Sequence, residues 1–444
     1  MGILLVISDK ISTFAVGYKR HGMNKELTKR LILEFQKQPL GIEMTRRDIT
    51  LAGQLNYVVV GLRRSGKSYL LYQQVEHLIA EGHSPEEMLY FNFEDDRTGE
   101  LTLADLDHIK VCYEELYAHR PIFFLDEIQN VDGWEHFARR IADQGFRTYV
   151  TGSNAKMLSR EIAGTLGGRY MIQTVSPYSF REYLRASSIE PEVHWSLSPQ
   201  RTEIRRSFDD YFHYGGLPEV ASIPPKLKRS WLNNLFNKIF FGDILQRYNI
   251  RNSSALKIMV RKLAESVRQP CSFTRLANIV SSTGKKVYTE TIIDYLRYTE
   301  DSCLIFSVEN YTAKIADKAT NKKYYFTDNG LLNLFLFDPQ SPLLENMVAI
   351  ALHSHFESEL CFYLHGNHEV DFYLWEQNIG IQVALSIADP ATRKREVEGI
   401  IKLSQRLHLK DMLIITYDEK EEIETEEGTI HVIPVWQWLL DYFE

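Results

Sequence analysis

The stretch that decides the fold is Gly61-Leu62-Arg63-Arg64-Ser65-Gly66-Lys67-Ser68, which follows Tyr57-Val58-Val59-Val60. The apolar run predicts a buried parallel strand, and the residues after the loop predict a helix. Such a loop binds phosphate, because its backbone N–H groups can surround phosphate oxygens and the helix N-terminus favours negative charge. Lys67 would reach the β- and γ-phosphates, and Ser68 would offer its hydroxyl to Mg²⁺. The alternative is a glycine-rich turn that arose by chance.

The loop supplies most of the candidate nucleotide-binding residues. They are Gly61, Arg64, Ser65, Gly66, Lys67 and Ser68. Arg63 and Arg64 lie inside the loop, where a guanidinium group can contact phosphate or can equally point outward.

A second strand indicates hydrolysis. Ile122-Phe123-Phe124-Leu125 is prone to form a strand and ends in Asp126-Glu127, which looks like a Walker B strand. Asp126 and Ser68 would hold Mg²⁺, and Glu127 would orient and polarise the attacking water. Two carboxylates favour an ATPase over a kinase, although Glu127 can also be read as a solvated acid at the end of a strand. No Asn-Lys-x-Asp guanine signature occurs in the sequence, so we expect ATP and Mg²⁺ as cofactors.

The spacing of strands and helices predicts the fold class. Strands are expected near residues 57, 89, 122, 147 and 170, with helical stretches between them. This alternation predicts an α/β fold of the P-loop NTPase type, with a doubly wound parallel sheet and nucleotide at the carboxyl ends of its strands. Glu94, Asp95 and Asp96 would lie at the same edge of the sheet as the loop. They either contact a substrate or form a solvated strand end.

The pattern changes between residues 241 and 332, where two helical patterns flank a Ser-Ser-Thr-Gly turn. Thr289 would cap the second helix, and Leu304-Ile305-Phe306 and Tyr324-Tyr325-Phe326 would form a hairpin. This order predicts a winged helix, a unit that can bind DNA. Beside Arg297, the second helix carries Glu290, Asp294, Glu300 and Asp301. An acidic face would be repelled by phosphates, and Lys285 and Lys286 compensate only in part, so a structural or protein-contacting role is favoured over DNA reading.

Further short motifs occur in order along the chain. They are Leu125-Asp126-Glu127-Ile128-Gln129-Asn130-Val131, Gly133-Trp134-Glu135, Thr151-Gly152-Ser153-Asn154, Gly168-Arg169, Pro177-Tyr178-Ser179-Phe180-Arg181-Glu182-Tyr183-Leu184, Tyr214-Gly215-Gly216-Leu217-Pro218, Asp243 with Arg247, Tyr325 with Asp328-Asn329-Gly330-Leu331, Leu344-Glu345-Asn346 and Val370-Asp371-Phe372. Together they resemble the large bacterial and archaeal family of predicted AAA+ ATPases fused to a C-terminal domain of unknown function. The likeness covers nearly the whole chain from about Met23 onward.

The resemblance implies roles for two further catalytic candidates beside Glu127. Asn154 stands where a polar residue senses the γ-phosphate in AAA+ proteins. Arg169 is implied as an arginine finger or a γ-phosphate sensor. A surface or interface arginine remains an equal alternative, because a finger that acts in trans requires a homo-oligomer. The helical segment from Tyr211 to Val220 resembles the small lid that closes over nucleotide.

The last part of the chain resembles a restriction-endonuclease-like fold. The pattern of that fold is a helix with an acid, a strand with an aspartate, and a strand that bears an acid-x-lysine. Glu345 and Asp371 match the first two, whereas Gln382 replaces the second acid and Ala384 replaces the lysine. Such a nuclease needs carboxylates for Mg²⁺ and a lysine for the water or phosphate. Lys394 on the following helix is the alternative source of charge, but we predict a nuclease-like scaffold without cleavage activity.

These patterns divide the chain into five parts. They are residues 1–22, which are either an extension upstream of the family start or an unusual N-terminal strand, residues 23–185 as the AAA+ P-loop core, residues 186–240 as a helical lid, residues 241–332 as the winged-helix-like domain, and residues 333–444 as the restriction-endonuclease-like domain.

Composition excludes several classes of protein. A chain of 444 residues with 44% hydrophobic content is enough for about three domains, and a net charge of −8 argues against charge-driven coating of nucleic acid. The four cysteines are scattered without metal-ligand spacing, which argues against a disulfide framework or a zinc site. No apolar run approaches the roughly 20 residues that cross a bilayer, so we expect a cytoplasmic protein that makes no membrane contact.

The order of modules predicts an ATP-dependent molecular switch, in which nucleotide changes the lid and so repositions the two C-terminal domains. The expected partner is an unidentified protein, with DNA as a lesser candidate. The alternatives are a DNA-processing nuclease regulated by ATP and a DNA-binding regulator that uses ATP as a signal.

Overall fold

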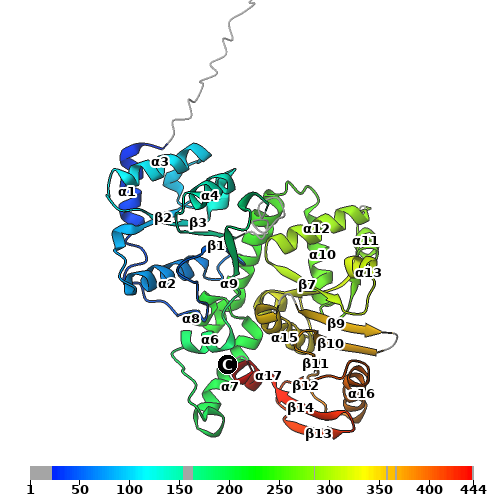
Figure 1. Cartoon of the computed structure of the whole chain (residues 1–444). Coiled ribbons are helices and arrows are strands. Elements are labelled where there is room, and N and C mark those ends of the chain that lie inside the picture. The colour runs from blue at the N-terminus through cyan, green and yellow to red at the C-terminus, as the bar shows by residue number, and fades with distance from the viewer. Residues whose placement is uncertain (1–22, 154–163, 285, 357–358, 366–367, 443–444) are drawn as a thin grey trace, which may run out of the picture.

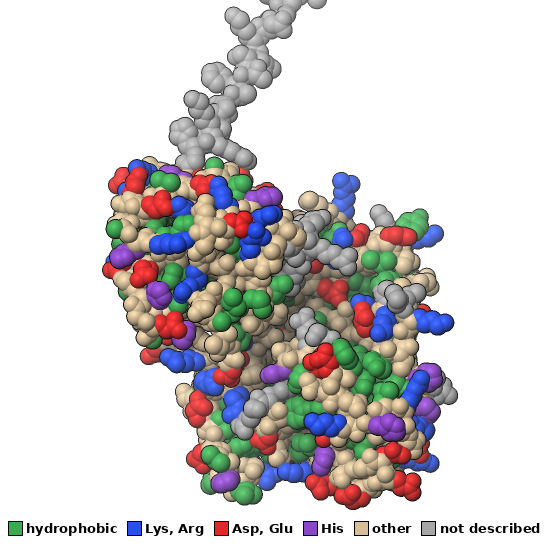
Figure 2. Space-filling model, viewed as in Figure 1, with side chains coloured by type: hydrophobic (Ala, Val, Ile, Leu, Met, Phe, Trp, Pro, Cys, Tyr) green, Lys and Arg blue, Asp and Glu red, His purple; other side chains and the backbone are tan. Residues whose placement is uncertain are grey.

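The computed structural model describes residues 23–153, 164–284, 286–356, 359–365 and 368–442. Two β-sheets lie in different parts of this chain, and a group of helices connects them (Figure 1). Acidic and basic side chains are interspersed over the visible face of the molecule (Figure 2).

The N-terminal sheet contains five strands. They are β1 Asn56–Val60, β2 Met88–Asn92, β3 Ile122–Asp126, β4 Thr148–Gly152 and β5 Tyr170–Thr174, in the order β2-β3-β4-β1-β5. Every neighbouring pair is parallel, which confirms the predicted parallel sheet. The α-helices of this region are α1 Lys25–Phe35, α2 Lys67–Ala80, α3 Leu103–Glu114 and α4 Trp134–Asp143. Short 3-10 helices span Pro85–Glu87, Asp96–Thr98 and Ile128–Asn130.

Different helices cover the two faces of this sheet. Side chains alternate between the faces along a strand, so Phe124 and its neighbour Phe123 point to opposite sides. On one side, Tyr90 packs against Tyr72 of α2, with ring centroids 5.4 Å apart. On the other, Phe123 packs edge-on against Phe137 of α4 at 6.1 Å. Burial on both faces explains why the central strands are continuously apolar rather than alternating.

A helical region follows the sheet. It consists of α6 Phe180–Ala186, a 3-10 helix at Trp195–Leu197, α7 Gln200–Tyr214, α8 Pro218–Ser222, α9 Pro225–Lys238 and a π-helix at Ile239–Gln246 that continues α9. The sequence predicted one helical segment from Tyr211 to Val220. That prediction is wrong in detail, because α7 ends at Tyr214 and Gly215 adopts a left-handed φ of +79°.

The Gly215-Gly216 turn is held by the C-terminal part of the chain. The carboxylate of Asp328 accepts hydrogen bonds from the backbone N–H groups of Gly216 at 2.9 Å and Leu331 at 3.1 Å. A Cβ atom on Gly215 would lie 2.2 Å from an oxygen of Asp328, so only glycine fits there. Two motifs that are far apart in the sequence therefore form one contact.

The C-terminal sheet contains nine strands, in the order β13-β14-β12-β11-β10-β9-β7-β8-β6. They are β6 Cys271–Ser272, β7 Ile305–Asn310, β8 Asn321–Phe326, β9 Leu360–His365, β10 His368–Leu374, β11 Ile379–Val383, β12 Asp411–Thr416, β13 Glu421–Thr425 and β14 Gly428–Pro434. The helices are α10 Ser253–Glu265, α11 Phe273–Ser282, α12 Thr289–Asp301, α13 Ile315–Thr320, α14 Asn329–Asn333, α15 Gln340–Phe356, α16 Pro390–Leu407 and α17 Val435–Asp441.

One local expectation for this half is confirmed, and another is wrong. Strands β7 and β8 pair antiparallel, as the predicted hairpin requires. Helix α12 begins at Thr289 with Tyr288 in the cap position, so Thr289 is the first helical residue rather than the cap. Parallel pairing of β7 with β9, through Glu309 with Cys361 and Asn310 with Phe362, joins the two parts of this half into one sheet.

The hydrophobic cores do not follow the sheets alone. The N-terminal sheet and α1 to α4 enclose one core. A second core runs without a break from the helical region into the C-terminal sheet. Leu62, which belongs to the glycine-rich loop, is buried in this second core and not in that of its own sheet. The loop therefore contacts both halves of the molecule.

Candidate functional site

The glycine-rich loop connects the end of β1 to the start of α2, as its sequence predicts. A Cβ atom on Gly61 would lie 2.2 Å from the carbonyl oxygen of Val175, which follows the neighbouring strand β5. Gly66 adopts a left-handed φ of +96° immediately before α2 begins at Lys67. Both positions therefore require glycine. The hydroxyl of Ser65 is buried in the loop and has no hydrogen-bond partner in the described part of the chain.

Lys67 points back into the loop. Its side chain is buried, and its ammonium group donates hydrogen bonds to the carbonyl oxygens of Gly61 at 3.3 Å and Leu62 at 3.2 Å. The carboxylate of Glu127, which directly follows β3, lies 3.6 Å from this ammonium group. The ammonium group therefore lies against the backbone of the loop and close to Glu127.

Asp126 ends β3 as a completely buried carboxylate. Tyr90 donates a hydrogen bond to it at 2.6 Å, and the hydroxyl groups of Thr151 and Ser68 also interact with it. Burial, together with the negative charge of Glu127, raises the pKa of Asp126. No basic side chain among the described residues forms an ion pair with it. Hard oxygen donors at Asp126 and Ser68, and a buried carboxylate that lacks a counter-charge, fit a Mg²⁺ ion.

Glu127 adopts a left-handed φ of +55°, a conformation that costs roughly 1–2 kcal/mol for a residue with a Cβ atom. Its backbone N–H group donates to the hydroxyl of Thr151 at 2.8 Å. Its carboxylate accepts hydrogen bonds from Gln129 and from the Ser153 hydroxyl at 3.0 Å. Burial acts to raise the pKa of Glu127, but the charge of Lys67 and these hydrogen bonds outweigh it and lower the pKa. Glu127 is therefore ionised at neutral pH, as a base must be.

Arg63 links the loop to a distant helix. Its guanidinium group donates to Asp243 of the π-helix at 2.9 and 3.3 Å and to Glu94 at 3.0 Å. The carboxylate of Asp243 is buried, and Arg247 lies 3.8 Å from it. Glu94 follows β2 and was expected at this edge of the sheet. The structure gives Glu94 an ion pair with the loop, so it is not simply a solvated strand end.

Two other arginines connect the same loop to neighbouring segments through ion pairs or hydrogen bonds. Arg64, a predicted phosphate ligand, lies 2.7 Å from Glu219 of α8 and is half exposed. Arg47 is buried and donates to the carbonyl oxygens of Ser65 and Ser176, each at 2.8 Å. Arg64 and Arg63 thus both reach toward the helical region.

The remaining predicted catalytic residues do not join this cluster in the described structure. Arg169 precedes β5, and its carbonyl oxygen accepts a hydrogen bond from Asn56 at the start of β1. Since the two strands are parallel, Arg169 lies at the opposite edge of the sheet from the loop of its own chain. Its guanidinium group pairs with Asp143 at the end of α4. Asn154 lies outside the described residues.

The sequence reasoning missed several residues of the site. Thr151 lies next to the end of β4 and Ser153 follows that strand; both were quoted only within a motif, although polar residues at strand ends on the loop side could have been flagged as a group. Tyr90 lies in the middle of β2, where no local signal marks it. Asp243 was noticed only as part of a motif with Arg247. No local pattern connects it to Arg63, because 180 residues separate the two.

Comparison with known proteins places this site in a family. Residues 54–184 match the family model of an AAA domain, and residues 205–341 match a domain of unknown function (DUF8612). The uncharacterized protein MJ1544 of Methanocaldococcus jannaschii is 31% identical over 396 residues, covering 87% of this chain and 88% of the relative. The chain belongs to this family of AAA-domain proteins. Another uncharacterized member, from Haemophilus influenzae, is 31% identical over 396 residues, covering 86% of this chain and 94% of its own.

The two matched regions of this AAA-domain protein meet at the loop. Arg63 and Arg64 lie within the AAA match, whereas Asp243 and Glu219 lie within the domain of unknown function. No helix in the described ranges is long and apolar enough to span a membrane.

Solved structures with some similarity include two proteins from archaea. The Walker-type ATPase PABY2304 of Pyrococcus abyssi is 15% identical and has a TM-score of 0.38, covering 70% of this chain and 95% of its own. The Aeropyrum pernix Orc1 protein, solved in complex with DNA, is 14% identical and has a TM-score of 0.30, covering 73% of this chain and 94% of its own. At TM-scores this low, the likeness carries no argument about the present chain.

Proposed function

We propose that this AAA-domain protein binds and hydrolyses ATP and uses the nucleotide state to reposition its C-terminal half. The observation that carries the proposal is the convergence of Lys67, Asp126 and Glu127. Lys67 lies 3.6 Å from Glu127, and Asp126 is the neighbouring carboxylate at the end of β3. A buried ammonium group, an ion-binding carboxylate and an ionised base are the parts that hydrolysis at a phosphate-binding loop requires.

The residues divide the chemistry between them. Ser68 and Asp126 would hold Mg²⁺, which neutralises phosphate charge when bound. Lys67 would exchange its two carbonyl partners for phosphate oxygens, and Ser65 would find a partner for its hydroxyl group. Glu127 would accept a proton from the attacking water, held in place by Ser153 and Gln129. Asn154 remains a predicted sensor of the γ-phosphate.

The arginines of the loop supply a route for coupling. Arg63 lies beside the site of the phosphates and at the same time pairs with Asp243 of the helix that leads into the C-terminal half. Arg64 pairs with Glu219 of α8. Phosphate charge would compete with these carboxylates for the guanidinium groups, so nucleotide binding and release would alter how the helical region is held. The second hydrophobic core, which contains Leu62 and extends into the C-terminal sheet, would transmit this movement to the C-terminal half.

We propose that residues 241–332 form a winged helix with a protein-contacting role. The order α10, β6, α11, α12, β7 and β8, with β6 and β7 both paired to β8, supports this assignment. On α12, Arg297 lies 3.0 Å from Asp294, so it already pairs with an acid of the same helix. Lys285 lies outside the described residues. The expected partner is a protein, and DNA is a weaker candidate because the helix that would read it is acidic.

We also propose that residues 333–444 form a nuclease-like scaffold without cleavage activity. Glu345 of α15 and Asp371 of β10 both lie close to the ammonium group of Lys323, at 3.4 and 3.5 Å. Gln382 of β11 accepts a hydrogen bond from the N–H group of Asp371 at 2.9 Å. Lys394 does not reach this cluster, since it is largely exposed and lies 3.7 Å from Glu398. The sequence-based alternative that Lys394 replaces the missing lysine is therefore not supported.

A homo-oligomer would give Arg169 a function. An arginine at the edge of the sheet opposite its own loop can reach only the nucleotide of a neighbouring copy. The four cysteines are free thiols, three of them buried, which suits a reducing compartment such as the cytoplasm.

The proposal is tested by Mg²⁺-dependent ATP hydrolysis across a series of protein concentrations, beside Lys67→Ala and Glu127→Gln. We expect activity per molecule to rise with concentration and to vanish in both variants, with Glu127→Gln still binding ATP. Nucleotide binding without turnover would leave a sensor that needs a partner. Failure of the wild-type protein to bind ATP would refute the proposal.

A further inference from the structure

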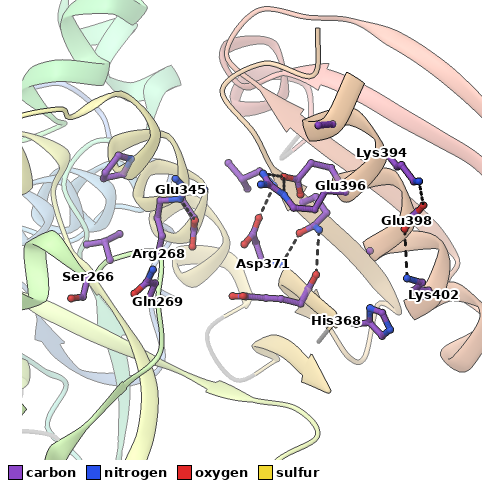
Figure 3. Close-up of a pocket in the computed structure, with 18 of the residues that line it drawn as sticks. Ser266, Arg268, Gln269, Glu345, His368, Asp371, Lys394, Glu396, Glu398 and Lys402 are labelled. Carbon is purple, nitrogen blue, oxygen red and sulfur yellow. Dashed lines mark hydrogen bonds and ion pairs between the residues drawn. The ribbon is translucent and has the colours of Figure 1, made fainter. Parts of the chain in front are cut away.

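A cleft of about 910 Å³ lies between the end of α10 and the C-terminal sheet, far from the phosphate-binding loop. Figure 3 shows Arg268 and Glu345 on one side of it and Asp371 with Glu396 on the other. Lys402, paired with Glu398, stands at its rim (Figure 3). Carboxylates from three different elements thus converge on one space.

A buried lysine that no sequence pattern singled out pairs with three of the carboxylates that line this cleft. Lys323 of β8 is completely buried. Its ammonium group lies 2.8 Å from Glu369, 3.4 Å from Glu345 and 3.5 Å from Asp371. Burial acts to lower the pKa of Lys323, but the charges of these carboxylates outweigh it and raise the pKa, so the ammonium group stays charged.

Oxygens of Glu345, Asp371 and Gln382 that could ligate a metal are already engaged within the protein. One oxygen of Glu345 accepts a hydrogen bond from Tyr325 at 2.9 Å, and its other oxygen lies 3.3 Å from Arg268. One oxygen of Asp371 accepts from the N–H group of Val383 at 2.9 Å. The amide oxygen of Gln382 is taken by the N–H group of Asp371. A cation entering this space would lose these donors and would meet the positive charge of Lys323.

We propose that Lys323 is a built-in counter-ion that takes the place of a divalent cation, so that this carboxylate cluster holds its shape without metal. The lysine comes from β8, in the part of the sheet that precedes α15, and not from β11 where a nuclease-like pattern carries it. The ammonium group stabilises Glu345 and Asp371 against each other, as a metal ion would, but leaves no open coordination position for a water molecule or a phosphate.

The test measures Mn²⁺ binding to the nucleotide-free full chain by electron paramagnetic resonance of the free ion. Lys323→Met keeps the length of the side chain and removes its charge. We expect this variant to gain a Mn²⁺ site that the wild-type protein lacks, and the double variant Lys323→Met/Asp371→Asn to lose it again. Lys402→Met, which removes a lysine at the rim of the same cleft, is the matched control and should gain nothing.

Two results would overturn the proposal. The first is Mn²⁺ binding by the wild-type protein that disappears in Asp371→Asn, because the cluster would then be a metal site as it stands. The second is a folded Lys323→Met protein, judged by circular dichroism, that gains no site. If Lys323→Met does not fold, the comparison of wild type with Asp371→Asn still decides, with Lys323→Arg as the variant that retains the charge. None of these readings depends on ATP turnover.

Discussion

The guanidinium group of Arg63 lies 2.9 Å from the carboxylate of Asp243, a residue 180 positions further along the chain. This ion pair joins the loop expected to hold phosphate to the helix that leads into the C-terminal half. The carboxylate of Asp243 is only 7% exposed, whereas the comparable pair of Arg64 with Glu219 is 54% and 38% exposed. Loss of a partner should therefore have different consequences at the two pairs.

The first prediction compares Arg63→Met with Arg64→Met. Arg63→Met leaves a buried carboxylate at Asp243, whose remaining basic neighbour in the described part of the chain is Arg247 at 3.8 Å. We expect it to lower the free energy of unfolding by about 3 kcal/mol, as removal of one partner of a buried pair does. Arg64→Met should cost less than about 1 kcal/mol, because exposed pairs contribute little. Urea unfolding without nucleotide measures both, and equal losses would contradict the assigned role of Asp243.

The second prediction concerns Thr151, whose hydroxyl group contacts the carboxylate of Asp126 and the backbone of Glu127. It donates to Asp126 and accepts from the N–H group of Glu127. Thr151→Val should reduce ATP turnover about tenfold or more, since a hydrogen bond to a charged group contributes about 1.5–3 kcal/mol. ATP affinity should change little. Thr148→Val, at the other end of the same strand, is the matched control. A turnover equal to that of wild type would show that the Thr151 hydroxyl is dispensable.

The third prediction tests whether Arg169 acts in trans. Arg169→Ala and Lys67→Ala should each be inactive alone. A mixture should recover part of the activity, because an intact loop in one copy can meet an intact Arg169 in another. The measurement is ATP hydrolysis at a fixed total concentration and varied ratio. Full activity of Arg169→Ala alone would assign this arginine to the surface, paired with Asp143.

The fourth prediction is a pH dependence that arises from Asp328. Burial raises its pKa from 3.8 to about 6, against the opposing hydrogen bonds from Leu331 and Gly216. A group whose pKa is raised on folding contributes stability that is complete below the unfolded pKa and is lost as pH rises through the folded pKa. From about pH 5 to about pH 8, this group should lower the free energy of unfolding by about 1 kcal/mol.

Urea unfolding at several pH values checks the contribution of Asp328. Asp328→Asn removes the titrating group, so its stability should fall less steeply over the same pH range than that of the wild-type protein. Parallel curves for the two proteins would show that the raised pKa of Asp328 does not influence folding.

The fifth prediction addresses the contact between α14 and the end of α7. A Cβ atom on Gly330 would lie 2.1 Å from the carbonyl oxygen of Tyr214. Gly330→Ala should therefore destabilise the protein by about 1–3 kcal/mol, which is the usual cost of overpacking. Gly164→Ala is the control, because nothing lies within 4 Å of its added Cβ. The midpoint of thermal unfolding should be clearly lower for Gly330→Ala than for Gly164→Ala. Similar midpoints would contradict the close approach of Gly330 to Tyr214.

The sequence predicted the N-terminal sheet and the parts of the site that are local. Lys67 follows its glycines directly, and Asp126 ends a strand that any apolar run of this kind would indicate. The lysine of the C-terminal cleft was missed for a physical reason. Lys323 follows a polar residue and another lysine on β8, and nothing in that stretch shows that this lysine alone is buried among carboxylates from other elements.

The helix near residue 215 was misread for a different reason. The expected helix ran across Gly215-Gly216 and Pro218, although glycine after a helix and proline at the start of the next are ordinary boundary signals. The hydrogen bond from Gly216 to Asp328 joins distant segments, and no local pattern predicts that contact.

The pairing of β7 with β9 has a consequence for how such chains can evolve. Glu309 and Asn310 of β7 pair with Cys361 and Phe362 of β9. Each of these two strands therefore covers an edge that the other would otherwise leave unpaired. A recombination event that exchanged the residues after α15 for an unrelated module would leave β7 as a bare edge, open to pairing with other chains. The two C-terminal modules are therefore expected to be inherited together.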